Sequence, residues 1–332
     1  PAGAIEQAKK IMLHTVAVSV ASRNMSPTAN AAAMAAARGT AGTASVWATG
    51  ARVAPTEAVY ANGTAADVLD WEDCTWTGHA SAGAVPAAFA YGEQKHASGK
   101  EVITAIVAAY EVYQRIAMAV QPEFDSYLAQ GRGWGLVNWQ VFASAVAAGK
   151  LLGLDALQMA ACISLAAYQA PTLMGKDGDG DIYHYAHGIA GRSGAESAEI
   201  TRQGFEYYYD GLEGDTGYWL YVSNRCEWDW LDKELGKTYG CRPRWMACTI
   251  SAQGRSWASP TLKRCAYHPS STSPAQRARC PWGLFRRNTA CPTALPVTSA
   301  ARSPRKIGTA CKAVPAKSCT RTAAADPLFI IC

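Results

Sequence analysis

Residues 98–120 read SGKEVITAIVAAYEVYQRIAMAV, and this stretch decides the fold class. Its apolar residues recur at spacings of three and four, the period of an α-helix with one buried face. Ser98 and Glu101 stand in capping-box spacing at its start, where their side chains can bond two backbone amides that lack helical partners. We therefore expect one long amphipathic helix whose buried stripe contains Val102, Ile103, Ile106, Val107, Tyr110, Tyr113 and Ala117.

The same pattern continues on both sides of this helix through the first 240 residues. Alanine is abundant and the alternation of β-branched residues that marks strands is rare. Asp155 and Gln158 repeat the capping-box spacing, and Gly153 is placed to end the helix before them. We predict an all-α domain over residues 1–238, with helices at about 3–21, 55–70, 84–97, 99–120, 134–152, 156–170 and 187–203.

Charge and composition change near residue 240. Residues 1–240 hold 16 Lys and Arg against 25 Asp and Glu, whereas residues 241–332 hold 15 Lys and Arg and one acid, Asp326. The basic segment also has eight of the 11 cysteines and ten prolines, and only 12 of its 92 residues are Leu, Ile, Val or Phe. That apolar content is too low for an ordinary folded core. The acidic first part excludes a simple one-domain nucleic-acid binder.

We interpret residues 239–332 as a basic Pro/Cys/Arg-rich segment that is not natively folded because it is translated out of frame or misassembled. A patterned apolar sequence in another reading frame of the encoding nucleic acid would support this hypothesis. A second interpretation is a basic disordered tail that binds nucleic acid or an acidic partner. A disulfide or zinc module is the third, but the segment contains no Cys-x-x-Cys pair.

The sequence predicts neither a membrane span nor an export signal. No stretch reaches the 18 uncharged apolar residues that a span needs. Residues 9–22 superficially resemble a signal peptide, but Glu6, Lys9 and Lys10 are placed on the polar face of an amphipathic helix. We therefore expect a cytoplasmic protein, in which the cysteines stay reduced. The start at Pro1 also suggests an incomplete N-terminus.

Residues 67–86, DVLDWEDCTWTGHASAGAVP, hold the candidate chemistry. Asp67, Asp70 and Asp73 are three apart, so a helix ending here would place their carboxylates on one face. Crowded acids repel one another, so we expect at least one of these carboxyls to have a raised pKa that suits proton transfer.

His79 follows in a short loop before the next helix, whose first turn would accept Pro86. Free backbone amides near residues 81–85 would form a site for an anion. Carboxylates, a histidine and an anion site suit proton chemistry on a carboxylate-bearing substrate. The alternative is a capped helix end with a solvated acidic face, and spacing alone does not distinguish the two.

Several motifs, in collinear order over about residues 4–237, resemble the MmgE/PrpD family. They are the acidic turn with Ala61-Asn62-Gly63 before it, Gly92-Glu93 to Gly99-Lys100, Ala109-Tyr110-Glu111-Val112 with Arg115, AGKLLGLD at 148–155 with Gln158, and His187-Gly188 through Gly194. The family includes 2-methylcitrate dehydratase, cis-aconitate decarboxylase and iminodisuccinate epimerase.

The resemblance implies a large helical domain followed by an α/β lid, usually in a homodimer, with a cofactor-free and metal-free active site between the domains. It also implies a lyase that dehydrates or decarboxylates a small di- or tricarboxylic acid. Since residues 239–332 do not read as a lid, we expect the lid to be missing or scrambled and the chain to have little activity as written, because water would enter the open cleft. The alternatives are an isomerase or epimerase of the family, or a non-catalytic helical scaffold with a basic tail.

Carried onto this sequence, the resemblance places Asp70 and His79 in the family's first active-site motif as the catalytic pair. Asp73 follows in the acidic pair, and Cys74 or Thr75 takes the place of a nearby hydroxyl residue. We expect Asp73 and Thr75 to contact the substrate.

Two positions depart from the decarboxylase pattern, with Trp134 in place of a histidine and Tyr183 in place of a lysine. Both changes remove groups that would neutralise a tricarboxylate and argue against the decarboxylase and methylcitrate activities specifically. We expect His184, His187 and Arg132 to supply positive charge, and the two histidines to bind substrate together with Trp134 and Tyr183. The two histidines could instead bind zinc, but no third ligand is evident, so we expect no metal.

Overall fold

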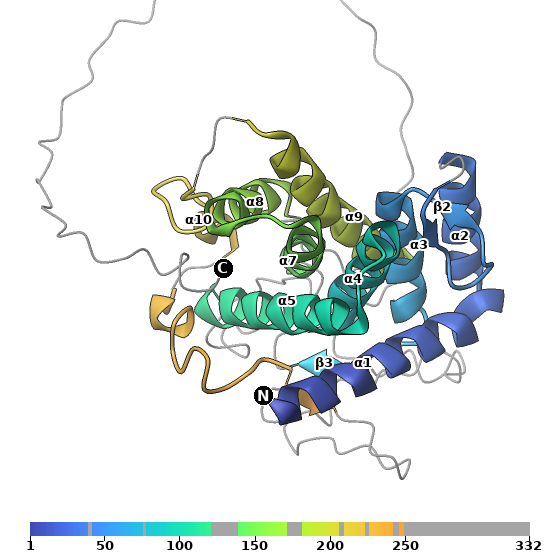
Figure 1. The fold of residues 1–332 in the computed structure, drawn as a ribbon, viewed down its shortest axis with the longest axis horizontal. Coiled ribbons are helices and arrows are strands. Elements are labelled where there is room, and N and C mark those ends of the chain that lie inside the picture. The colour runs from blue at the N-terminus through green and yellow to red at the C-terminus, as the bar shows by residue number, and fades with distance from the viewer. Residues whose placement is uncertain are drawn as a thin grey trace, which may run out of the picture. The chain divides into compact units, whose positions relative to one another are not determined.

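A computed structural model describes residues 1–38, 42–75, 78–120, 139–170, 181–205, 209–222, 226–241 and 246–248. The described residues are mostly helical, as predicted, and Figure 1 shows the helices packed around one another. Helices occur at α1 (Ala2–Ala21), α2 (Ser26–Arg38), α3 (Pro55–Asp67), α4 (Ser81–Lys95), α5 (Gly99–Val120), α7 (Gln140–Leu152), α8 (Ala156–Gln169), α9 (Ile182–Gln203) and α10 (Trp219–Val222). Single 3₁₀ turns lie at η1 (Ser22–Asn24) and η2 (Trp228–Trp230).

Two short antiparallel pairings accompany the helices. Strand β1 (Ala44–Ser45) pairs with β2 (Arg52–Val53), and β3 (Cys74–Thr75) pairs with β4 (Met246–Cys248). The predicted segment 239–332 lies outside the described residues from 249 onward, so the lid prediction stays untested.

The caps that were read from the sequence are confirmed. The Glu101 carboxylate accepts from the Ser98 amide at 2.7 Å, and the Glu101 amide donates to the Ser98 hydroxyl at 3.3 Å. Asp155 and Gln158 form the same reciprocal box, and Gly153 ends α7 with a φ of +79°. Because these contacts are local, four residues of sequence are enough to specify each of them.

The helices differ from the prediction in several places. Helix α2 was not predicted, because the face it buries consists of small, weakly apolar residues, although these recur at helical spacing: Pro27, Thr28, Ala31, Ala32 and Ala35. Helix α9 begins at Ile182, five residues before the predicted start, and α4 begins at Ser81 rather than at 84. Pro86 therefore lies inside α4 and not in its first turn. The predicted residues 134–138 lie outside the described part of the chain.

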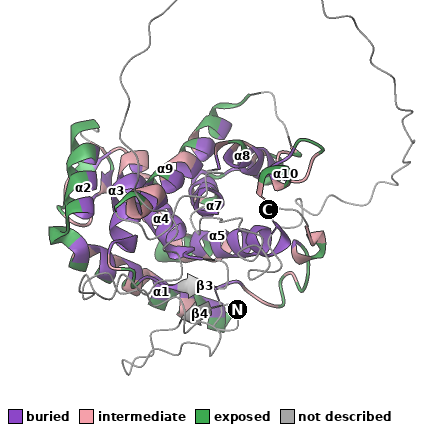
Figure 2. Ribbon diagram, turned by 180° about the vertical axis from the view of Figure 1, so that it is seen from behind, coloured by how far each residue is buried: buried purple, intermediate pink, exposed green. Residues whose placement is uncertain are grey.

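Helix α7 lies at the centre of the core and packs against α4, α5, α8 and α9 (Figure 1). It is buried along nearly its whole length, as its purple ribbon in Figure 2 shows. Small residues let its neighbours come close: a Cβ added to Gly194 of α9 would meet the Val141 carbonyl oxygen and the Ser144 hydroxyl. A Cβ added to Gly188 would meet Thr64 and the Tyr60 carbonyl of α3. These close approaches bring the end of α3 beside the start of α9.

Residues 227–241 are fastened to α5 by one buried arginine. Arg115 donates to the carbonyl oxygens of Trp230 and Lys233, at 3.2 and 2.9 Å, and to the Glu111 carboxylate at 3.0 Å. The other Glu111 oxygen accepts from the Gly240 amide. The Arg115 motif of the family resemblance therefore has a structural function here.

Helix α5 is the helix of the described chain that is long and apolar enough to cross a membrane. In this fold 72% of its apolar window is buried against other helices. That burial is typical of a core helix.

We predict that Gly194→Ala destabilises the protein by about 2–3 kcal/mol, because the new methyl group overlaps the backbone of α7, which cannot move without disturbing the core. Gly99→Ala is the control, since a Cβ there meets nothing within 4 Å, and we expect a change below about 0.5 kcal/mol. Chemical denaturation measures both, and equal stabilities of the two variants would contradict the described packing.

Candidate functional site

The acidic turn does not continue the helix before it. Helix α3 ends at Asp67, whose carbonyl accepts from the Asp70 amide at 2.8 Å, and Asp70 takes a left-handed φ of 51°. The predicted stacking of Asp67, Asp70 and Asp73 on one helix face is therefore wrong. The chain reverses after one turn and sends the three side chains into different surroundings.

A narrow turn then sets the position of His79. The Thr75 amide and hydroxyl both donate to the Gly78 carbonyl, at 2.7 and 2.9 Å. Thr75, predicted to contact substrate, is 1% exposed, and its hydroxyl holds this turn. The residue directly after the turn, His79, precedes α4 and points into the protein.

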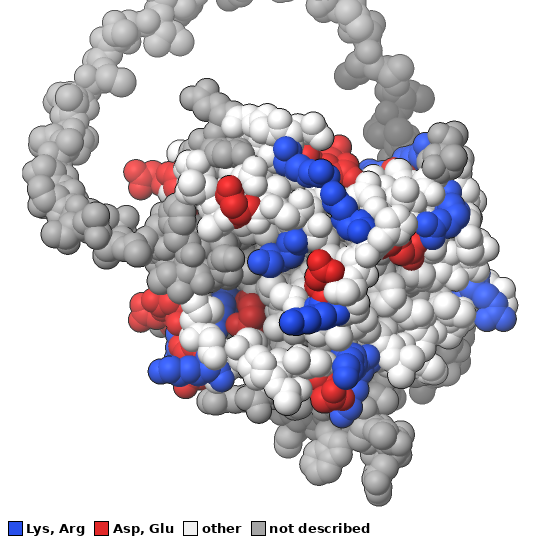
Figure 3. Space-filling view, viewed as in Figure 1, with Lys and Arg blue, Asp and Glu red and all other residues white. Residues whose placement is uncertain are grey.

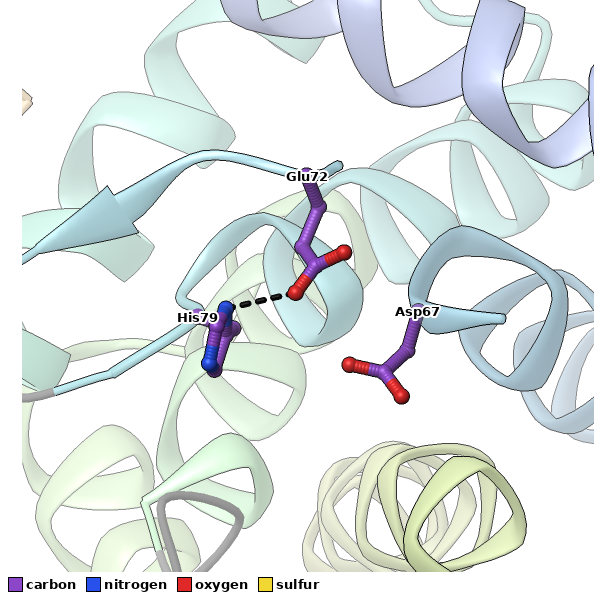
Figure 4. Close-up of side chains that lie close together, drawn as sticks. All are labelled: Asp67, Glu72 and His79. Carbon is purple, nitrogen blue, oxygen red and sulfur yellow. Dashed lines mark ion pairs between the residues drawn. The ribbon is translucent and has the colours of Figure 1, made fainter. Parts of the chain in front are cut away.

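His79 meets a carboxylate that sequence analysis did not single out. Its Nδ1 lies 2.6 Å from Oε1 of Glu72, and Figure 4 shows the carboxylates of Glu72 and Asp67 both turned toward the imidazole. The side chain of Glu72 is 0% exposed and that of His79 is 8% exposed. The signal that could have found Glu72 is its position beside Asp73 in the acidic pair, seven residues before His79.

Asp67 joins α3 to the start of α9. His184 Nδ1 lies 2.6 Å from one of its oxygens, and His187 Nε2 lies 3.2 Å from the other. Gln140 of α7 lies behind them, with its Nε2 3.2 Å from His187 Nδ1 and bonded to the His79 carbonyl. Since the Gln140 amide donates to Nδ1, the proton of neutral His187 is on Nε2 and faces Asp67.

The aromatic ring of Tyr183 completes this side of the site. Its centroid lies 4.9 Å from that of His187 and 6.4 Å from that of His79, both edge to face. The fold thus brings together Tyr183, His184 and His187 with His79, as the sequence predicted. Trp134 and Arg132 lie outside the described residues.

Burial and crowding shift the proton affinities of the central pair. Burial and the nearby charge of Asp67 raise the pKa of Glu72, and the adjacent His79 opposes that rise. Burial alone would lower the pKa of His79, but Glu72, Asp67 and Asp70 raise it to about 10. The expectation that at least one of Asp67, Asp70 and Asp73 has a raised pKa is confirmed for Asp70 and Asp73, with burial as the main cause.

The two histidines of α9 differ in charge. Burial lowers the pKa of His187 to about 4, although Asp67 opposes that shift, so His187 is neutral at pH 7. The expectation that His187 supplies positive charge is therefore wrong. His184 is only half-buried, and its bond to Asp67 outweighs its desolvation and raises its pKa. Burial opposes ionisation of Asp67, but these histidines overcome it and lower the pKa of Asp67.

Asp70 and Asp73 occupy opposite environments. Asp70 is exposed, close enough to His79 and His184 for their charges to act on it, and partial desolvation raises its pKa. Asp73 is buried, and one of its oxygens accepts from the Tyr110 hydroxyl of α5 at 2.7 Å. This hydrogen bond connects the acidic turn after α3 to α5.

The predicted anion site at the start of α4 is not formed. The amides of Ala82 and Gly83 donate to the carbonyls of His79 and Ala80 at 3.3 Å, and the Ala84 amide donates to Ala80 at 3.0 Å. Ala80 already has helical backbone angles, so preceding carbonyls take up these donors.

Asp67, Glu72 and His79 each offer one metal-ligand atom, and these atoms lie within 4.8 Å of one another. The sequence analysis weighed His184 and His187 and the C-terminal cysteines as metal ligands and missed this group. Two ligands of one tetrahedral zinc ion lie about 3.4 Å apart, whereas His79 Nδ1 and Glu72 Oε1 are 2.6 Å apart. This separation fits a direct ion pair between the two side chains.

Comparison with known proteins agrees with the motifs in the sequence. The family model of the MmgE/PrpD N-terminal domain matches residues 1–231. A cis-aconitate decarboxylase of Aspergillus terreus is 33% identical over 149 residues, which make up 43% of this chain and 29% of that protein. The cis-aconitate decarboxylase of A. terreus strain NIH 2624 has the same identity and coverage. The match thus spans less than a third of these relatives.

We predict that His187 makes the fold acid-sensitive. The unfolded state binds a proton at this residue near pH 6.5 and the folded state only near pH 4, so stability falls as the pH drops through that interval. The full loss is about 3 kcal/mol. His187→Gln should reduce the fall in unfolding free energy between pH 7 and pH 4.5, as measured by denaturant titration.

His96, an exposed histidine at the end of α4, supplies the control. We expect His96→Gln to keep the acid sensitivity of the wild type. An unchanged fall in the His187→Gln variant would contradict the neutral, buried state of that ring.

Proposed function

Since this chain belongs to the MmgE/PrpD family, we propose that it carries out lyase-type proton chemistry, by dehydration or decarboxylation, on a small di- or tricarboxylic acid. The match to the family's N-terminal domain confirms the resemblance that the sequence motifs indicated. The observation that carries the proposal is the buried His79–Glu72 pair beside the ionised Asp67. A protonated imidazole held among carboxylates is suited to moving a proton to or from a carbon or oxygen of a substrate.

The roles follow from exposure and charge. His79 and the exposed Asp70 are the proposed proton-handling residues, since Asp70 reaches solvent within electrostatic range of His79. His184 is the proposed cation for a substrate carboxylate, because Asp67 holds its Nδ1 and raises the pKa of the ring. It would replace part of the charge that is lost where Tyr183 stands in place of lysine.

The two alternative functions, an epimerase and a nucleic-acid-binding scaffold, require different features of the protein. An epimerase of the family would use the same proton-handling pair. A nucleic-acid-binding scaffold would need a continuous basic surface. On the face seen in Figure 3, basic and acidic side chains are interspersed over the described residues. The homodimer and the cytoplasmic location stay predictions, and light scattering of the purified chain tests the first of them.

Because the lid is expected to be missing, we predict slow but detectable turnover of a small di- or tricarboxylic acid by the full chain. Citrate, 2-methylcitrate and cis-aconitate are the first acids to screen, with proton NMR of the reaction mixture as the readout. His79→Ala and Asp70→Asn should each reduce kcat/KM by at least about 100-fold, the effect of removing a general acid or base. Glu6→Gln, on the exposed face of α1, is the control and should keep full activity.

Each result of this screen decides the proposal. Turnover that disappears in the two site variants supports it. Binding of an acid without turnover, or turnover that survives both substitutions, overturns the assignment of lyase chemistry to this site.

A further inference from the structure

Glu72 is fully buried although no Lys or Arg among the described residues pairs with its carboxylate. Its side chain is 0% exposed, and burying a carboxylate is costly unless a partner compensates. His79 Nδ1, at 2.6 Å, is that partner. Neither Glu72 oxygen has a hydrogen bond of good geometry among the described residues, so the ion pair with His79 is the contact that compensates the buried carboxylate.

The contact fixes the orientation of the imidazole. Glu72 holds Nδ1, and Figure 4 shows the second ring nitrogen of His79 pointing away from Glu72. A carboxylate on Nδ1 determines which ring nitrogen carries the proton and stabilises the imidazolium. Nε2 is thus the nitrogen that remains for a substrate.

The charges around His79 favour its cationic form. Acidic groups come from the end of α3 and from the turn after it. Helix α9 contributes one aromatic hydroxyl, one imidazole with a raised pKa and one with a lowered pKa. The helix α7 contributes only the neutral amide of Gln140, which bonds the His79 carbonyl. The full set is Asp67, Asp70, Glu72, Asp73, Tyr183, His184 and His187.

We propose that Glu72 is a positioning residue that holds His79 as an imidazolium, so that His79 meets the substrate through Nε2–H as a proton donor and not as a base. The proposal rests on the proposed function and deepens it, since it assigns the acid to His79 and leaves the exposed Asp70 as the candidate base. In a dehydration, the Nε2–H bond breaks as its proton passes to the leaving hydroxyl oxygen of the substrate, the C–O bond breaks with its electron pair on that oxygen, and water leaves. Asp70 takes up the proton lost from the neighbouring carbon, and the double bond forms from the electron pair of that C–H bond. His79 then gains one proton from solvent and Asp70 releases one to solvent, so both groups return to their starting state.

Glu72→Gln tests the proposal, because glutamine keeps an oxygen that can accept from Nδ1–H and removes only the charge. The readout is the titration of His79 in the full chain labelled with ¹⁵N-histidine, followed by its ring nitrogen and carbon-bound proton shifts. We expect the wild-type His79 to stay protonated at pH 8, and the midpoint to fall by at least about one pH unit in Glu72→Gln, consistent with loss of a neighbouring opposite charge.

Glu57→Gln is the matched control, because Glu57 lies on α3 and pairs with Arg38 and Arg192 rather than with a histidine. It should leave the His79 titration unchanged. If a substrate is turned over, the rate of Glu72→Gln should fall at least tenfold at pH 8 and recover toward lower pH, where His79 regains its proton.

Two outcomes overturn the proposal. One is a wild-type His79 that titrates near the ordinary histidine value of about 6.5. This measurement uses the wild-type protein alone, so it does not depend on whether a variant folds. The other is a His79 midpoint that is the same in wild type and in folded Glu72→Gln. Because these are measured without substrate, a failure of the lyase activity is distinguishable from a failure of the Glu72 assignment.

Discussion

The site depends on a single buried carboxylate at a helix end. Asp67 is the last residue of α3, and its two oxygens contact His184 and His187 from the first two turns of α9. An isolated carboxylate in a protein interior would take up a proton, but the bond from His184 and the nearby charge of His79 favour the ionised form of Asp67. Because Asp67 stays ionised, its field reaches His79 and Glu72 and helps to set the protonation of both.

The packing of small residues makes that contact possible. Gly188 lies one residue after His187, and at this position α9 comes against the Tyr60 carbonyl and the Thr64 side chain of α3. Any larger side chain would push the helices apart and move both histidines away from Asp67. Helix α7 supports the arrangement from behind, since Gln140 binds the backbone of His79 and the ring of His187 together. The chemistry therefore rests on the same helix contacts that form the core.

The elements with local causes were predictable. The helix at 99–120, the two capping boxes and the glycine that ends α7 all follow from residues close together in the sequence. Where the cause was not local, prediction failed. The buried face of helix α2 is made of small, weakly apolar side chains, and the helix takes its place through packing against α3. The amides at the start of α4 looked free, but the helical geometry of Ala80 lets preceding carbonyls accept from them.

The sequence by itself determined the helical class of the first part of the chain, its family and the acidic turn with His79 as the place for chemistry. Periodicity, cap spacing and motif order are properties of neighbouring residues, and these are visible in one dimension. Only the tertiary structure decided that Glu72 and not Asp73 binds His79, and that the pKa of His184 is raised where that of His187 is lowered. The reason is that Asp67 and His184 are 117 residues apart, and the burial that separates the two histidines exists only after α3, α7 and α9 have packed.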